Sequence, residues 1–131
     1  MLKNITKSIK KEKMKVHLGK KIIEIKEVQE CKGMNQAIGL MFARREKANA
    51  LIFKFSKPTK MAIHSFFVFF SFLAVWLDDK NRVIEVKKVK PFIPLVSSTK
   101  RYHNLLEIPL NRKYRETLKY FKHFSTGIPK I

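Results

Sequence analysis

The alternation of hydrophobic and polar positions divides most of the chain into short segments that predict strands. In residues 15–25, apolar side chains occupy every second position on either side of Gly19. A period of two places alternate side chains on opposite faces of a strand, so this region predicts a hairpin that turns at Gly19. Further strands are predicted at 51–55, 82–89 and 103–108.

The run MAIHSFFVFFSFLAVWL, residues 61–77, contains no acid and no amine. It could form one membrane-spanning helix, one buried helix or two interior strands. A span needs about 20 mostly apolar residues, and this run is shorter and contains His64, Ser65 and Ser71. Aromatic and β-branched side chains favour strands. We therefore expect adjacent buried strands at 62–70 and 72–77, with Ser71 at the turn, and no membrane span.

Two segments change to a helical period. Met34, Ile38 and Met41 recur at spacings of four and three, which predicts a short helix over residues 33–40. Residues 111–124 have the same period, with basic side chains opposite the apolar ones, and predict an amphipathic C-terminal helix. Its apolar positions are Tyr114, Leu118 and Phe121.

These elements together predict a mainly β (α+β) fold: a small, barrel-like single domain with an antiparallel or mixed sheet, a short helix near 33–40 and the C-terminal helix. A chain of 131 residues is long enough to bury its own core. Residues 1–13 are basic without periodicity, so we expect a flexible tail there and one globular domain over 14–131.

The charge balance is strongly positive: 29 lysines and arginines against 10 acids give a net charge of +19. Such an excess attracts polyanions, so nucleic acid is a plausible partner. The single cysteine, Cys31, excludes an internal disulfide and is expected to be a small buried apolar group. The N-terminus has no apolar core of the length that a secretory signal needs. These features favour a cytoplasmic location.

Many of the basic residues fall in three stretches that are predicted to lie at the surface. If the barrel brings them together near Phe92, the result is a positive surface with rings on which bases can stack. The alternative is that the amines are spread evenly over the solvent face, which gives weak nonspecific attraction. The candidate polyanion-binding residues are Lys54, Lys57, Lys60, Arg82, Lys87, Lys88, Lys90, Lys100, Arg101 and Tyr102.

The sequence contains no recognisable catalytic constellation, and we expect neither a metal nor another cofactor. The four histidines lack the close helical spacing of a zinc pair. Asp78 and Asp79 lie in a predicted turn, where they would point apart instead of acting as an acid and base pair. His64 is the unusual residue, because it lies within the aromatic run. With Arg44, it marks a possible pocket.

Five landmarks occur in order along the chain: GLMF at 39–42, LIFKF at 51–55, HSFFVFF followed by VWLDDKNRVIEV, KPF at 90–92, and LLEIP at 105–109. Together they resemble the prokaryotic family known as domain of unknown function 192, over residues 16–109. The resemblance implies a small, mainly β, barrel-like domain with a short helix before the GLMF element. It implies no assigned biochemical role.

The chain departs from that family's pattern at several positions. The family often has an arginine directly after the GLMF element, whereas this chain has Ala43 and then Arg44. Many members carry polar residues in the aromatic segment and an aspartate just past a proline. The residues in those neighbourhoods here are Phe66, Phe67, Ser71 and Leu73. The departures reduce the polarity of any pocket, so no catalytic role is carried over from the family.

Two functions of different classes follow from the sequence. The first is a non-enzymatic binding module for a polyanion such as nucleic acid, suggested by the charge. The alternative is a module that docks on a membrane or on another protein through the basic amphipathic helix over 111–124. A third hypothesis, an enzyme or small-ligand protein, would use a pocket near His64.

Overall fold

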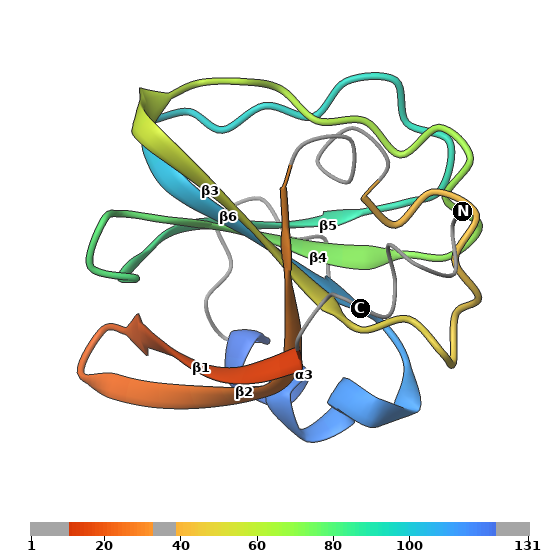
Figure 1. Ribbon diagram of the computed structural model, residues 1–131, viewed down its shortest axis with the longest axis horizontal. Coiled ribbons are helices and arrows are strands. Elements are labelled where there is room, and N and C mark those ends of the chain that lie inside the picture. Colours follow the sequence, from red (N-terminus) through yellow and green to blue (C-terminus); the bar gives the residue numbers. More distant parts are fainter. Residues whose placement is uncertain (1–10, 33–38, 123–131) are drawn as a thin grey trace.

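A single sheet of six strands, in the order β1-β2-β3-β6-β4-β5, organises the chain. The computed structural model describes residues 11–32 and 39–122 (Figure 1). The elements are β1 (Lys11–Leu18), β2 (Lys21–Cys31), β3 (Ala50–Thr59), β4 (Phe72–Leu77), β5 (Val83–Val89), β6 (Tyr102–Pro109), the 3₁₀ turn η1 (Arg112–Tyr114) and the helix α3 (Arg115–Phe121).

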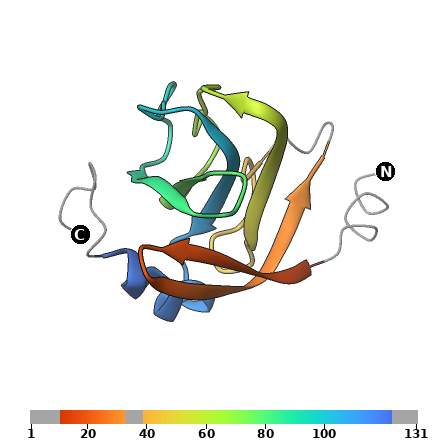
Figure 2. The same ribbon diagram turned by 90° about the vertical axis from the view of Figure 1, so that its left-hand side faces the viewer.

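The sheet is mixed and curls into a half-barrel. All neighbouring strands are antiparallel except β2 and β3, which are parallel. β1 and β5 are the two edges, yet His17 of β1 pairs with Arg82, just before β5, and its N–H donates to the carbonyl of Asn81 at 2.9 Å. The edges therefore meet at one end, where the β1–β2 hairpin crosses beneath the other strands (Figure 2). The mainly β, barrel-like prediction is confirmed.

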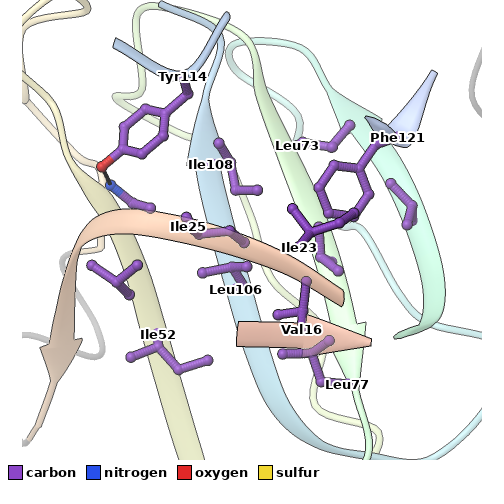
Figure 3. Packing of buried hydrophobic residues seen from close by; sticks show 14 residues of the cluster. Val16, Ile23, Ile25, Ile52, Leu73, Leu77, Leu106, Ile108, Tyr114 and Phe121 are labelled. Carbon is purple, nitrogen blue, oxygen red and sulfur yellow. Dashed lines mark hydrogen bonds between the residues drawn. The ribbon is translucent and has the colours of Figure 1, made fainter. Parts of the chain in front are cut away.

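One face of the sheet packs against the β1–β2 hairpin and α3 (Figure 3). Side chains at every second position of the strands, and at a period of about 3.6 residues along the helix, point toward this interface. We call this cluster the helix-side core. It consists of Val16, Ile23, Ile25, Val28, Ala50, Ile52, Leu73, Val75, Leu77, Val86, Leu106, Ile108, Tyr114 and Phe121.

The C-terminal helix is confirmed, although it is shorter than predicted and begins after a 3₁₀ turn. Its apolar face belongs to the helix-side core: Tyr114 and Phe121 are buried and Leu118 is partly buried. The Tyr114 hydroxyl accepts a hydrogen bond from the Ala50 N–H at 2.7 Å and donates to the Glu27 carbonyl at 2.9 Å. Because this face is used inside the domain, it is not the docking surface that the alternative function requires.

The other face of the sheet is covered by two irregular segments, residues 60–71 and 90–101, instead of by regular elements. An isolated bridge between Ile63 and Val96 joins them. β4 is buried at all its positions because both of its faces are covered. We call the second cluster the loop-side core. It consists of Cys31, Leu40, Ala48, Leu51, Phe53, Val68, Phe70, Phe72, Ala74, Trp76, Val89, Tyr102 and Leu105.

The prediction of a strand over 62–70 is wrong, whereas the strand over 72–77 is confirmed. Only Ile63 in the earlier segment forms a bridge, and the chain turns at Phe66 and Phe67. Phe67 has a φ of 62°, which is incompatible with an extended strand. The neighbours of β4 are instead β5 and β6.

Three predicted features fall partly outside the described residues. Of the predicted C-terminal helix over 111–124, residues 123–124 lie outside them. Of the predicted helix over 33–40, residues 33–38 lie outside them and 39–40 are in a turn. Of the predicted tail over 1–13, residues 11–13 belong to β1, so the strand begins earlier than expected. In the described part of the chain, no helix has both the length and the apolar character that crossing a membrane requires.

Candidate functional site

Five phenylalanine side chains gather at the surface on three loops, although their residue type favours burial. Each is between 45% and 66% exposed. The ring centroids of Phe42 and Phe67 are 5.3 Å apart, and those of Phe69 and Phe92 are 5.4 Å apart. Phe42 also lies 6.5 Å from Phe69, which joins the two pairs. We call Phe42, Phe66, Phe67, Phe69 and Phe92 the phenylalanine cluster.

Three residues of the cluster have an unusual backbone conformation. Phe42, Phe67 and Phe92 have φ values of 61°, 62° and 64°, in the left-handed region that bulky residues avoid. Each costs roughly 1–2 kcal/mol relative to an ordinary conformation. The Phe42 N–H donates to the Phe67 carbonyl at 2.9 Å. This hydrogen bond joins the loop before β3, which carries Phe42, to the loop before β4, which carries Phe67.

Ser65 joins the loop of residues 60–71 to the loop of residues 90–101. Its side chain is completely buried, and its Oγ donates to the Lys90 carbonyl at 2.6 Å and accepts from the Ile93 N–H at 2.6 Å. Its carbonyl also accepts from the Phe92 N–H at 2.9 Å. One small hydroxyl thus sets the positions of the loops that carry most of the phenylalanine cluster.

The loops that carry the cluster contain one acidic residue, Glu46, which lies 3.4 Å from Arg45. Residues 47–77 and 86–106 carry lysine and arginine but neither aspartate nor glutamate. Arg44 and Lys90, each two residues from a phenylalanine of the cluster, are exposed. Coulomb attraction between such a surface and an anion is therefore opposed by few neighbouring carboxylates.

Three of the sequence-predicted basic residues form ion pairs. Lys54 lies 3.5 Å from Glu30, and Arg82 lies 2.5 Å from Asp78 in the β4–β5 turn. Lys87 lies 3.6 Å from the buried Glu85. Its ammonium also lies over the Trp76 ring at 5.8 Å. These lysine and arginine charges are partly neutralised within the domain.

The remaining predicted residues divide between sites. Thr59 of β3 pairs with Tyr102 of β6, so four exposed basic residues lie at adjacent backbone positions: Lys57, Lys60, Lys100 and Arg101. Lys88 lies opposite Leu73 on the helix side of the sheet and is separate from them. Tyr102 is only 1% exposed, and its hydroxyl donates to the Met61 carbonyl at 2.6 Å. Its ring is therefore not available for stacking on bases.

His64 and Arg44, the predicted pocket residues, lie on different segments of the chain. His64 is exposed, contrary to the expectation of an imidazole within a buried strand, and its Nδ1 accepts from the Phe66 N–H at 3.2 Å. It lines a cavity of about 190 Å³ in the loop-side core. Arg44 is not among the residues that line this cavity, and its carbonyl accepts hydrogen bonds from the next turn of the chain.

Glu107 is the residue that sequence reasoning missed. Within the described residues, it is the only acidic side chain that lines the cavity, and it is 5% exposed. Burial raises the pKa of its carboxyl from 4.5 to about 8. A period of two along the strand predicted at 103–108 puts Leu106 and Ile108 on one face and Glu107 on the other, which for a half-buried strand faces solvent. A sheet that is covered on both faces has no such solvent side.

Two further expectations concern metals and thiols. Among residues 11–32 and 39–122, no three His, Cys, Asp or Glu side chains are close enough together to hold a metal ion. Cys31 is buried as expected, and burial, with smaller contributions from Glu107 and Glu30, raises the pKa of its thiol to about 12. The thiol therefore stays protonated at neutral pH.

The curled mixed sheet with a loop-covered face defines a small half-barrel β domain. The chain belongs to the family DUF192, described as an uncharacterised ACR, whose model matches residues 16–119. The predicted resemblance is confirmed. No curated protein shows significant sequence similarity to the chain.

Two solved structures share the fold. One is a candidate transcription regulator from Sinorhizobium meliloti 1021, with a TM-score of 0.69 and 14% identity over 84% of this chain and 88% of that one. The other is a protein of unknown function from Novosphingobium aromaticivorans DSM 12444, with a TM-score of 0.64 and 16% identity over 79% of this chain and 76% of that one.

Proposed function

We propose that the protein is a non-enzymatic binding module for a polyanion, and specifically for single-stranded nucleic acid. The observation that supports this is the phenylalanine cluster, in which half-exposed rings lie within contact distance of one another on loops that contain a single acidic residue, Glu46. Contiguous exposed apolar surface on a small domain marks an interaction site. Flanking cations favour an anionic partner.

Bases stack on aromatic rings with a gain of about 1–3 kcal/mol per base, and they do so in any sequence. In the phenylalanine cluster, Phe67 and Phe92 present their rings from neighbouring loops at 52% and 54% exposure. The backbone strain at both residues is consistent with selection for display of the rings, because strained conformations concentrate at functional sites.

The cations have two roles in this proposal. Arg44 and Lys90 are close in sequence to the cluster and would contact phosphates beside the stacked bases. Lys60 and Arg101, at the end of β3 and the start of β6, would extend the contact along the strand of nucleic acid. The net charge of +19 would increase the association rate at low ionic strength.

The test is fluorescence anisotropy with labelled single-stranded DNA and RNA of roughly 12 nucleotides, a length comparable to the site sizes of small β-barrels. The wild-type protein should bind both, and binding should weaken steeply between about 50 mM and about 200 mM salt. The double variant Phe67→Ala, Phe92→Ala should weaken binding by about tenfold or more, because two stacking contacts are lost.

The matched control is Tyr120→Ala, which removes a ring with 51% exposure from α3, on the other side of the sheet. It should leave the affinity unchanged. The proposal fails if the wild type does not bind oligonucleotides at low salt, or if Tyr120→Ala and the double variant have the same effect. Binding to anionic lipid vesicles without binding to oligonucleotides would also contradict it.

A second comparison tests the cations. Lys90→Gln should reduce the slope of log affinity against log salt by about one unit, the value expected for one phosphate contact. Lys26→Gln, at an exposed position on β2, should leave the slope unchanged. Equal slopes for the two variants would exclude Lys90 from the interface.

A further inference from the structure

None of the five residues of the phenylalanine cluster lines the cavity that contains Glu107, and the chemistry of this cavity differs from that of the surface. It lies between residues 61–68 and the sheet, and its lining includes Phe53, Phe72 and Leu105. We call it the carboxyl cavity. Its lining is mostly apolar, with one carboxyl, so it is chemically unlike the basic surface outside.

Glu107 lies on β6, near the middle of the sheet. Its neighbours across the sheet are Leu51 and Ala74. A Cβ at Gly39 would lie 3.5 Å from Glu107 Oε1 and 3.5 Å from the Phe53 ring. Glycine at position 39 therefore keeps that side of the carboxyl free of a side chain.

In the part of the chain that the structure describes, no lysine, arginine or histidine forms an ion pair with Glu107. An ionised carboxylate in apolar surroundings is costly unless a cation or several hydrogen-bond donors compensate it. The lining is therefore complementary to a ligand that brings a positive charge and apolar surface together.

The volume limits the ligand. At about 190 Å³ the cavity is smaller than the pockets that hold drug-sized molecules. It would hold about six water molecules at roughly 30 Å³ each. The rings of Phe53 and Phe55 in the lining suit an organic cation, because aromatic faces attract cations as well as apolar groups.

We propose that the carboxyl cavity binds a small organic amine, with its ammonium group paired to the Glu107 carboxylate and its hydrocarbon part against the aromatic lining. The cation replaces the proton that the empty site holds: the protonated carboxyl and the ammonium ion form a carboxylate–ammonium pair and release one proton. Binding therefore strengthens as pH rises toward 8.

Two other titratable groups near the cavity do not ionise in this pH range. Burial raises the pKa of the Tyr102 hydroxyl, and that of the Cys31 thiol, to about 12, so both stay neutral. His64 also lies on the lining. Protonation of the Glu107 carboxylate at acid pH therefore weakens amine binding.

The test uses calorimetry and NMR titration of the full chain with benzylamine, and with benzyl alcohol as the uncharged isostere. Benzylamine should bind about tenfold or more tightly than benzyl alcohol at pH 8, and the difference should shrink as pH falls to about 6. Repeating the titration in buffers of different ionisation enthalpy should reveal the released proton.

Two variants make the result specific. Glu107→Gln should remove the preference for the amine while leaving benzyl alcohol binding unchanged. Ala62→Leu, which fills the lining without touching the carboxyl, should weaken both ligands. Circular dichroism of each variant checks that the fold is intact.

The proposal is overturned if benzylamine does not bind at millimolar concentration, if benzyl alcohol binds equally well, or if Glu107→Gln keeps the preference for the amine. Oligonucleotide binding by Glu107→Gln should match the wild type. The two proposals can thus fail independently of each other.

Discussion

The two faces of the sheet differ in what covers them. On the helix side, a hairpin and a helix cover the strands, and Tyr114, whose hydroxyl has both a donor and an acceptor, is the only residue of that core with a polar side chain. On the loop side, irregular segments cover the strands and enclose Glu107, Cys31 and Tyr102. Apolar packing stabilises the first face, and the second carries the phenylalanine cluster and the carboxyl cavity, on which the two proposals rest.

Backbone strain follows the same division. Of the five non-glycine residues with positive φ in the described chain, three belong to the phenylalanine cluster. Glu27 and Asn81, the other two, lie in β2 and in the β4–β5 turn. A domain can tolerate strain on one face when the other face supplies enough stability. The following experiments test this division, beginning with the largest expected effect.

The helix-side core should dominate the stability. Leu106 is completely buried in its centre, so Leu106→Ala should lower the free energy of unfolding by about 2–5 kcal/mol through lost burial and an internal cavity. Leu95→Ala, in the covering loop at 69% exposure, should change it by less than about 0.5 kcal/mol. Urea unfolding followed by circular dichroism measures both. Similar values for the two variants would contradict the division.

Glu107 should make the stability dependent on pH. Its pKa is raised from 4.5 to about 8 in the folded protein, so the folded state holds a proton that the unfolded state has lost. The free energy of unfolding should therefore be greatest below pH 4.5 as far as this group is concerned. It should then fall by up to about 1.4 kcal/mol per pH unit until about pH 8.

The comparison is with Glu107→Gln, which cannot ionise and should give a flatter profile of unfolding free energy between pH 5 and pH 8, measured by urea titration at each pH. An unchanged slope in the variant would show that Glu107 keeps an ordinary pKa. The matched substitution Glu116→Gln, at an exposed position on α3, should leave the slope as in the wild type.

Ser65 should affect the loops more than the fold. Ser65→Ala leaves the Ile93 N–H and the Lys90 carbonyl without their partner, which costs about 1–3 kcal/mol when the groups are buried. Oligonucleotide affinity should fall even under conditions in which the variant is fully folded, because the loops no longer hold the rings together. Ser98→Ala, which removes a hydroxyl that donates to the nearby Lys100 carbonyl, is the control and should keep the affinity.

Much of the fold was predictable from the sequence because its strands alternate with a period of two. The turn at Gly19, with a φ of 61°, and the buried strand β4 follow directly from that pattern. Asp78 was also predicted to form a turn, and its carboxylate accepts from the N–H groups of Lys80 and Arg82. These are local preferences of the sequence, and in natural proteins local preferences agree with the final fold.

The candidate site was not predictable in the same way. A run of phenylalanines indicates burial, and nothing in the local sequence distinguishes Phe70, which is buried, from Phe69, which is exposed. The difference arises from loops that are distant in the chain and that Ser65 holds together. Glu107 could have been suspected, because an acid between apolar residues of a central strand has no route to solvent.

The experiment with the smallest expected effect distinguishes two properties of Phe67, the strain of its backbone conformation and the exposure of its ring. Phe67→Gly and Phe67→Ala both remove a ring that is half exposed, so both should lose oligonucleotide affinity. They differ in the backbone, because glycine adopts a φ of 62° without strain and alanine does not. The glycine variant should therefore be about 1 kcal/mol more stable than the alanine variant in urea unfolding. Equal stability would mean that the left-handed conformation at Phe67 relaxes once the ring is gone, and that the ring itself, through its contact with Phe42, imposes the conformation.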